Sequence, residues 1–237
     1  MRVAVLALAA LALAGCESSQ TKSARLAKAA KGATKETGVV VKRVNPDVSV
    51  VSTSLVRDQY GAAAVVELRA KGAQADLPLA MVVRDANGKA AYANDVPGLE
   101  HSLTHVALVA PGERAFWIDD QVRADGSKRV EVKVGTSTAA VPRSLPKLVP
   151  GGLALEPDPS GAFTRGTLRN ESAIEQRKVI VYAVAERGGK VVAAGRAGIE
   201  RLKARGSAPF KVFWIGNPKG AKVYVFAPPT VLQEGNG

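Results

Sequence analysis

The chain has 237 residues, of which 46% are hydrophobic, and its 33 Lys and Arg outnumber its 21 Asp and Glu to give a formal net charge of +12. This length allows one or two domains. The single cysteine, Cys16, excludes a disulfide framework, a cysteine-type structural zinc site and a Cys-x-x-Cys redox motif.

The first segment of the chain has the three parts of an export signal. Arg2 provides a positive start, and residues 3–12 are apolar but too few for a transmembrane helix, which needs about 20 residues. The residues directly before Cys16 are Leu13, Ala14 and Gly15. This string resembles the lipobox of bacterial lipoprotein signal peptides.

The resemblance implies that residues 1–15 are a signal peptide that is cut off before Cys16. It also implies that the Cys16 sulfur carries a covalent diacylglyceryl group, which anchors the protein in the cell membrane, facing outside the cytoplasm. The alternative is a secretory signal with an incidental cysteine.

Residues 16–44 follow as a basic segment. Five basic residues recur there at three- to four-residue steps: Lys22, Arg25, Lys28, Lys31 and Lys35. We interpret the segment as a solvated tether. The alternative is contact with anionic headgroups, worth about 1 kcal/mol per Lys or Arg near the surface. We expect no nucleic acid partner, because no aromatic residues alternate with the basic ones.

Residues 45–136 predict a first β-sandwich. The alternation of apolar residues indicates strands at 48–55, 63–69, 79–84, 90–93, 104–109, 114–118 and 129–134. Asn87-Gly88 predicts a tight hairpin turn, because both residues accept positive φ angles.

Residues 137–152 predict a linker, because three prolines and two adjacent glycines fall within it, with the boundary near Pro146. Residues 153–233 then predict a second β-sandwich. Its expected strands are 153–156, 162–169, 178–186, 191–194, 197–202, 208–215 and 221–226. Gly188-Gly189 predicts a tight hairpin turn between residues 178–186 and 191–194.

The two halves share strings in the same order. Phe116-Trp117-Ile118 recurs as Phe213-Trp214-Ile215. We therefore predict a duplicated module and an all-β fold of two tandem immunoglobulin-like antiparallel β-sandwiches. Alternation places each Trp opposite its Phe and Ile neighbours, so we expect one of the two sets to face outward and to offer a surface for partner contact.

The second half resembles the FxLYD-type immunoglobulin-like domains of bacterial lipoproteins and exported proteins, although the eponymous string is absent. The matching positions are Gly166, Leu168, Asn170, residues 179–185, Gly189, Leu202 and Phe210. In the first half, Pro111-Gly112-Glu113 before Phe116 fits the same late turn. The resemblance implies an extracytoplasmic setting and an accessory or binding role.

Two polar clusters are candidates for chemistry. One cluster is Glu100, His101 and His105, which includes both histidines of the chain. Four residues of extended chain span about 13 Å, too far for both rings to bind one zinc, so only a tight loop would allow them to share it. Asp119-Asp120 suggests a calcium site or paired carboxylates, and we interpret it instead as a polar loop that ends a strand. We expect no metal and no cofactor other than the lipid.

These observations predict a lipid-anchored extracytoplasmic interaction or structural accessory protein with an unidentified protein partner and no catalytic activity. The alternative is a ligand- or ion-binding lipoprotein associated with a transporter or an envelope complex. An enzyme would need His101 or His105 within hydrogen-bond reach of a hydroxyl or carboxylate in a cleft.

Overall fold

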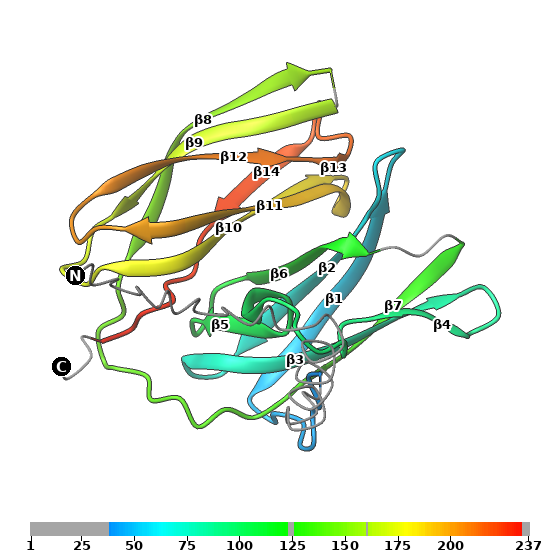
Figure 1. Cartoon of the computed structure of the whole chain (residues 1–237), viewed down its shortest axis with the longest axis horizontal. Coiled ribbons are helices and arrows are strands. Elements are labelled where there is room, and N and C mark those ends of the chain that lie inside the picture. The colour runs from blue at the N-terminus through cyan, green and yellow to red at the C-terminus, as the bar shows by residue number, and fades with distance from the viewer. Residues whose placement is uncertain (1–37, 123–125, 160, 234–237) are drawn as a thin grey trace, which may run out of the picture. The chain divides into compact units, whose positions relative to one another are not determined.

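The computed structural model describes residues 38–122, 126–159 and 161–233, all within one compact unit. These residues form antiparallel strands in several sheets, and their one helical element is a 3₁₀ turn at His101–Leu103 (Figure 1). The predicted all-β sandwich fold is confirmed. Cys16, the lipobox and the five spaced basic residues lie outside the described residues.

The first half of the fold contains two layers. One sheet has three strands in the order β1 (Val48–Arg57), β2 (Ala62–Ala70) and β6 (Ala115–Val122). The other is built around β3 (Gln74–Asp85), which pairs with β4 (Ala90–Ala93), β5 (His105–Val109) and β7 (Ser127–Val134). Leu68, Leu79 and Trp117 are fully buried in the core between these layers.

The second half repeats this arrangement. One sheet has the order β12 (Ser207–Phe213), β9 (Gly161–Asn170) and β8 (Leu148–Asp158). The other has the order β13 (Ile215–Gly216), β11 (Lys190–Leu202), β10 (Gln176–Arg187) and β14 (Lys222–Phe226). Leu168, Val181 and Trp214 are buried in the core between them.

The expected strands differ from the observed ones mainly at their ends. The two strands expected at 191–194 and 197–202 are one continuous strand, β11. Strand β8 begins at Leu148, so the last residues of the predicted linker are in a strand. Pro150 is accommodated there because β8 is at the edge of its sheet, where a missing N–H group does not break a ladder.

A buried asparagine joins two short strands to one side of β3. The Asn94 amide donates to the carbonyl oxygens of Leu79 and Leu103, both at 2.8 Å, and its oxygen accepts from the Met81 N–H at 2.7 Å. The side chain therefore replaces the backbone partners that β3 lacks between β4 and β5. This arrangement sets the start of β5, where His105 lies.

Candidate functional site

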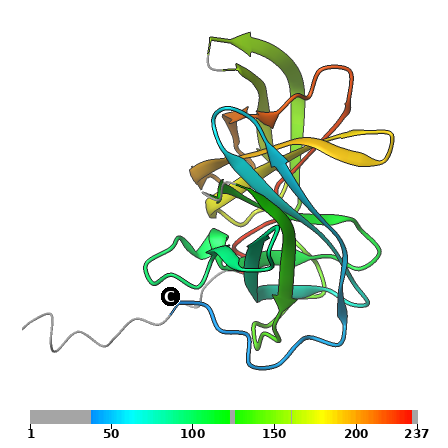
Figure 2. The ribbon, with the colours of Figure 1, turned by 90° about the vertical axis from the view of Figure 1, so that its right-hand side faces the viewer.

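The two halves meet along a third apolar cluster, which we call the joint. Strand β11 of the second half contacts β1, β2 and β6 of the first, as the two views of the ribbon show (Figures 1 and 2). The sheet of β1, β2 and β6 is thus covered on both faces. The buried residues of the joint are Ala63, Val65, Phe116, Ile118, Tyr182, Val184 and Ala194.

The joint corrects the expectation that one face of each aromatic set is exposed. In the first half Trp117 lies in the sandwich core while Phe116 and Ile118 lie in the joint, so all three are buried. In the second half Trp214 is buried and the expectation holds for Phe213, which is 49% exposed, but not for Ile215, which packs against the joint. When a strand is covered on both faces, the side chains of neither face are exposed to solvent.

An arginine links the halves at one border of the joint. Arg114 Nε donates to Glu67 of the first half at 2.7 Å, and Arg114 Nη2 donates to Glu186 of the second half at 2.6 Å. Its guanidinium also lies 4.8 Å from the ring centre of Phe116. The hydrogen bond from Arg114 lowers the pKa of Glu67, which keeps this nearly buried carboxylate ionised.

A second arginine, Arg196 of β11, links the halves elsewhere along the joint. Its Nε donates to Asp120 at 2.7 Å and its Nη1 to the Ser102 hydroxyl at 3.1 Å, both in the first half. Its side chain is only 8% exposed. Burial has the largest single effect on Arg196 and alone would lower its pKa, but the charge and hydrogen bond of Asp120, together with Tyr182 and Glu100, make the net shift upward.

The expectation that the Asp119-Asp120 pair ends a strand in a polar loop is corrected, because the strand continues past the pair to Val122. Both residues lie inside β6 rather than in a loop. Asp119 is fully buried and accepts a hydrogen bond from the Tyr92 hydroxyl at 2.7 Å, whereas Asp120 pairs with Arg196. Burial raises the pKa of Asp119. Alternation along β6 sends neighbouring carboxylates to opposite faces, so they do not share one site.

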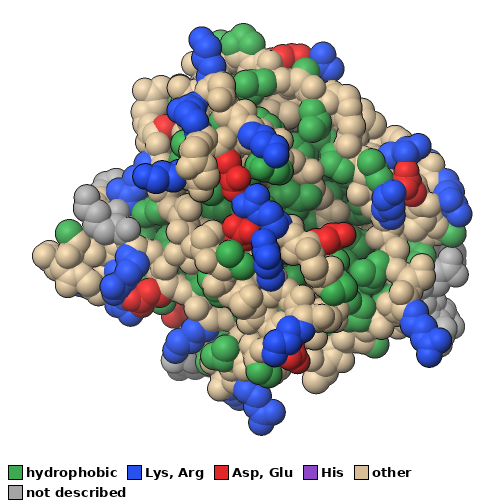
Figure 3. Space-filling model, turned by 180° about the vertical axis from the view of Figure 1, so that it is seen from behind, with side chains coloured by type: hydrophobic (Ala, Val, Ile, Leu, Met, Phe, Trp, Pro, Cys, Tyr) green, Lys and Arg blue, Asp and Glu red, His purple; other side chains and the backbone are tan. Residues whose placement is uncertain are grey.

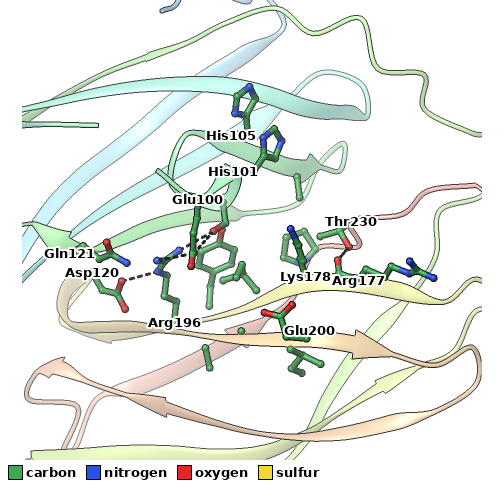
Figure 4. Close-up of a pocket in the computed structure, with 18 residues that line it drawn as sticks. Glu100, His101, His105, Asp120, Gln121, Arg177, Lys178, Arg196, Glu200 and Thr230 are labelled. Atoms are coloured by element: carbon green, nitrogen blue, oxygen red, sulfur yellow. Dashed lines mark hydrogen bonds and ion pairs between the residues drawn. The ribbon is translucent and has the colours of Figure 1, made fainter. Parts of the chain in front are cut away.

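A groove of about 800 Å³ opens beside Arg196 and is lined by both halves (Figure 4). The first half contributes Glu100 and Asp120 to one wall. The second half contributes Arg177 and Lys178 from β10 and apolar surface from Tyr182. Both charge signs are therefore present within one hollow, which suits a ligand or peptide segment with polar and apolar parts.

Both histidines lie at the rim of this groove, side by side in Figure 4. Their rings stack with centroids 4.0 Å apart because the chain makes a 3₁₀ turn at 101–103 instead of running extended. The argument from a 13 Å span is therefore wrong. His101 Nε2 lies 2.5 Å from Asp76 Oδ1, and His105 Nδ1 lies 2.9 Å from the Thr104 hydroxyl.

These contacts meet the geometric condition set for an enzyme. The single proton of the Thr104 hydroxyl has two acceptors in reach, the carbonyl oxygen of His101 at 3.2 Å and His105 Nδ1 at 2.9 Å. Within the described residues, no hydrogen bond joins His101 to a hydroxyl group. Burial, followed by the neighbouring His101, lowers the pKa of His105.

Sequence reasoning missed Arg114, Arg196 and Asp76 as contributors to this region. Arg114 is 72 positions from Glu186, and Arg196 is 76 from Asp120, so no local spacing reveals the pairs. The number of basic residues does not locate these pairs either. On the face shown in Figure 3, Lys and Arg side chains are scattered singly and in small groups, several beside carboxylates.

Comparison with known proteins does not add to this geometry. No protein-family model matches the chain, and no curated protein matches it. The part of the chain that the structure describes has no helix of the length and apolarity that crossing a membrane requires.

Proposed function

We propose that this chain is a lipid-anchored extracytoplasmic accessory protein that presents a double sandwich for partner binding and catalyses no reaction. The anchor is the diacylglyceryl group on Cys16, and the basic segment behind it is the tether. The observation that supports this role is the joint, because it holds the two sandwiches together as one unit that can offer a surface to a partner.

The construction of the joint favours a fixed support over a hinge. Proteins that close around a ligand bend at a few residues between their lobes. Here the halves share a buried apolar cluster, and Arg114 and Arg196 each bind carboxylates or hydroxyls of the opposite half. Opening the joint would expose that cluster and separate both charge pairs.

The groove supports the alternative of a ligand-binding lipoprotein associated with a transporter. Its walls come from both halves and carry Arg177 and Lys178 opposite Glu100 and Asp120. Thermal unfolding with candidate metabolites separates the two functions, since a ligand that binds the folded state raises the melting temperature in a saturable way and a pure scaffold shows no such shift.

Anchoring is tested with Cys16→Ala in the full chain, expressed in a bacterium fed with labelled palmitate. We expect the wild type to incorporate label and to stay with the membrane after a carbonate wash. We expect Cys16→Ala to do neither, while the neighbouring control Ser18→Ala behaves as the wild type. Label in Cys16→Ala would contradict the proposal.

Partner binding is tested by placing a photo-crosslinking residue at Arg177 on the groove wall and, as a control, at Lys89 in the turn before β4. We expect a discrete adduct in cells at Arg177 and none at Lys89. Absence of an adduct at Arg177 would remove the groove from the proposed partner surface.

A further inference from the structure

Three side chains that are typical metal ligands meet near the start of β5: Asp76, His101 and His105. Their ligand atoms all lie within 4.8 Å of one another. Asp76 comes from β3, His101 from the 3₁₀ turn and His105 from the first position of β5. None of these three residues belongs to the apolar cluster of the joint or bonds to Arg114 or Arg196.

The backbone brings these ligands together by a kink that both sandwiches share. Asp76 has a φ of 50°, and so does Lys178, each at the third position of the central strand of its half. The kink therefore belongs to the sandwich rather than to a site. What distinguishes the first half is a carboxylate at that position and two imidazoles beside it.

Thr104 contacts the His105 imidazole through a hydrogen bond that can orient the ring as a metal ligand. Its hydroxyl lies 3.2 Å from the His101 carbonyl oxygen and 2.9 Å from His105 Nδ1. In the tautomer in which this hydroxyl donates to the carbonyl oxygen, it accepts the Nδ1–H of His105, and the Nε2 lone pair is then free to bind a metal. Histidines that bind metals usually donate their other ring N–H to an oxygen in this way.

We propose that Asp76, His101 and His105 form a binding site for a divalent late first-row transition metal ion. Two imidazoles and one carboxylate suit Zn(II) and Cu(II), whereas Mg(II) and Ca(II) prefer oxygen ligands alone. Three protein donors leave at least one position for water or for a group of a binding partner.

The ligands can reach one ion with side-chain rotation. Donors that share an ion lie at most about 4 Å apart, twice the metal–ligand distance. The Asp76 and His101 side chains are 52% and 67% exposed, so packing does not hold them in place. This proposal goes beyond the accessory role and departs from the sequence-based expectation of no metal.

The test is calorimetric titration of the untagged full chain in detergent with Zn(II), and separately with Ca(II) as the oxygen-preferring control. We expect saturable binding of one Zn(II) and none of Ca(II). We expect His105→Ala and Asp76→Asn each to weaken the Zn(II) affinity by about 10-fold or more, the effect that loss of a supporting group already has at metal sites.

Asp76→Asn is the sharper variant, because asparagine tolerates the positive φ of this position as well as aspartate does. Glu113→Gln, at an exposed carboxylate in the loop before β6, is the matched control and keeps the wild-type affinity. With Cu(II), electron paramagnetic resonance of the wild type shows nitrogen hyperfine structure that His101→Ala with His105→Ala removes. No Zn(II) binding by the wild type, or binding that these variants leave unchanged, overturns the proposal.

Discussion

At the scale of single residues, one carboxylate of this protein, Asp119, is placed where water is scarce. Asp119 has no exposed surface, and its oxygens accept from the Tyr92 hydroxyl and from the Gln121 N–H at 2.9 Å. These two bonds reduce the cost of a buried carboxylate without removing it, since the pKa of Asp119 remains raised by burial.

Asp119 therefore makes the stability depend on pH. Below about pH 3.9, the pKa of an unfolded aspartate, the group is protonated in both states. As the pH rises toward the raised pKa of the folded state, the unfolded chain loses its proton first, and stability falls. Asp119→Asn removes this loss. Urea unfolding from pH 3 to pH 7 should show the variant gaining stability relative to the wild type.

Tyr92→Phe tests the same pair from the donor side. Loss of the hydroxyl leaves the Asp119 carboxylate with one partner fewer, and hydrogen bonds to charged groups contribute about 1.5–3 kcal/mol. We expect a loss of that size in the free energy of unfolding at pH 7 and a smaller loss at pH 3. An equal loss at both values would show that Asp119 is not the charged partner.

At the scale of elements, β11 is the strand on which the second half depends, because it belongs to a sheet and also to the joint. Two of its glycines differ in surroundings. A Cβ at Gly195 would press into the backbone oxygen of Phe213, whereas a Cβ at Gly198 would meet nothing closer than Ile180 Cδ1 at 4.0 Å.

Gly195→Ala should therefore destabilise the protein by about 1–3 kcal/mol or more, because the contact is with backbone that has no room to move. Gly198→Ala, in the same strand, should be neutral or stabilising by about 0.5–1 kcal/mol. Chemical denaturation of both variants measures the difference. Equal effects would mean that β11 does not approach β12 as closely as the structure shows.

The sequence predicts much at this scale. Period-2 alternation located every long strand, and Asn87-Gly88 and Gly188-Gly189 located two hairpins, since those signals are local. The expected positive φ at both turn residues is found at Gly188 and Gly189, whereas in the first hairpin Gly88 has a positive φ and Asn87 does not. Long-range pairing is not local. Three features depend on partners that are distant in the chain. Residues 190–202 form one strand, β11, instead of two, Pro150 lies in strand β8 instead of a linker, and the Asn94 side chain bonds to β3 between β4 and β5.

At the scale of the whole molecule, the joint decides how the two sandwiches behave, and the sequence does not reveal it. Its residue Phe116 was visible in a repeated string, but only contact between the halves explains why Phe116 is buried and its counterpart Phe213 is exposed. The histidine cluster was visible too, yet its third member, Asp76, is 25 positions from His101.

Arg196→Ala should cost about 3 kcal/mol. Breaking a buried ion pair typically costs about 3–5 kcal/mol, and the low end applies because Asp120 keeps 25% of its side chain exposed. Arg201→Ala, on the same strand, is the matched control. Arg201 pairs with Glu175 at the surface with 64% of its side chain exposed, so its loss should cost about 0–1 kcal/mol. Equal costs in urea unfolding would argue against the joint.

The central claim is that the two sandwiches form one support through the joint, and scanning calorimetry of the full chain in detergent tests it most directly. The wild type should unfold in a single transition whose calorimetric and van't Hoff enthalpies agree. Arg114→Ala combined with Arg196→Ala should broaden or split that transition. Two separate transitions in the wild type, unaffected by these substitutions, would contradict the account.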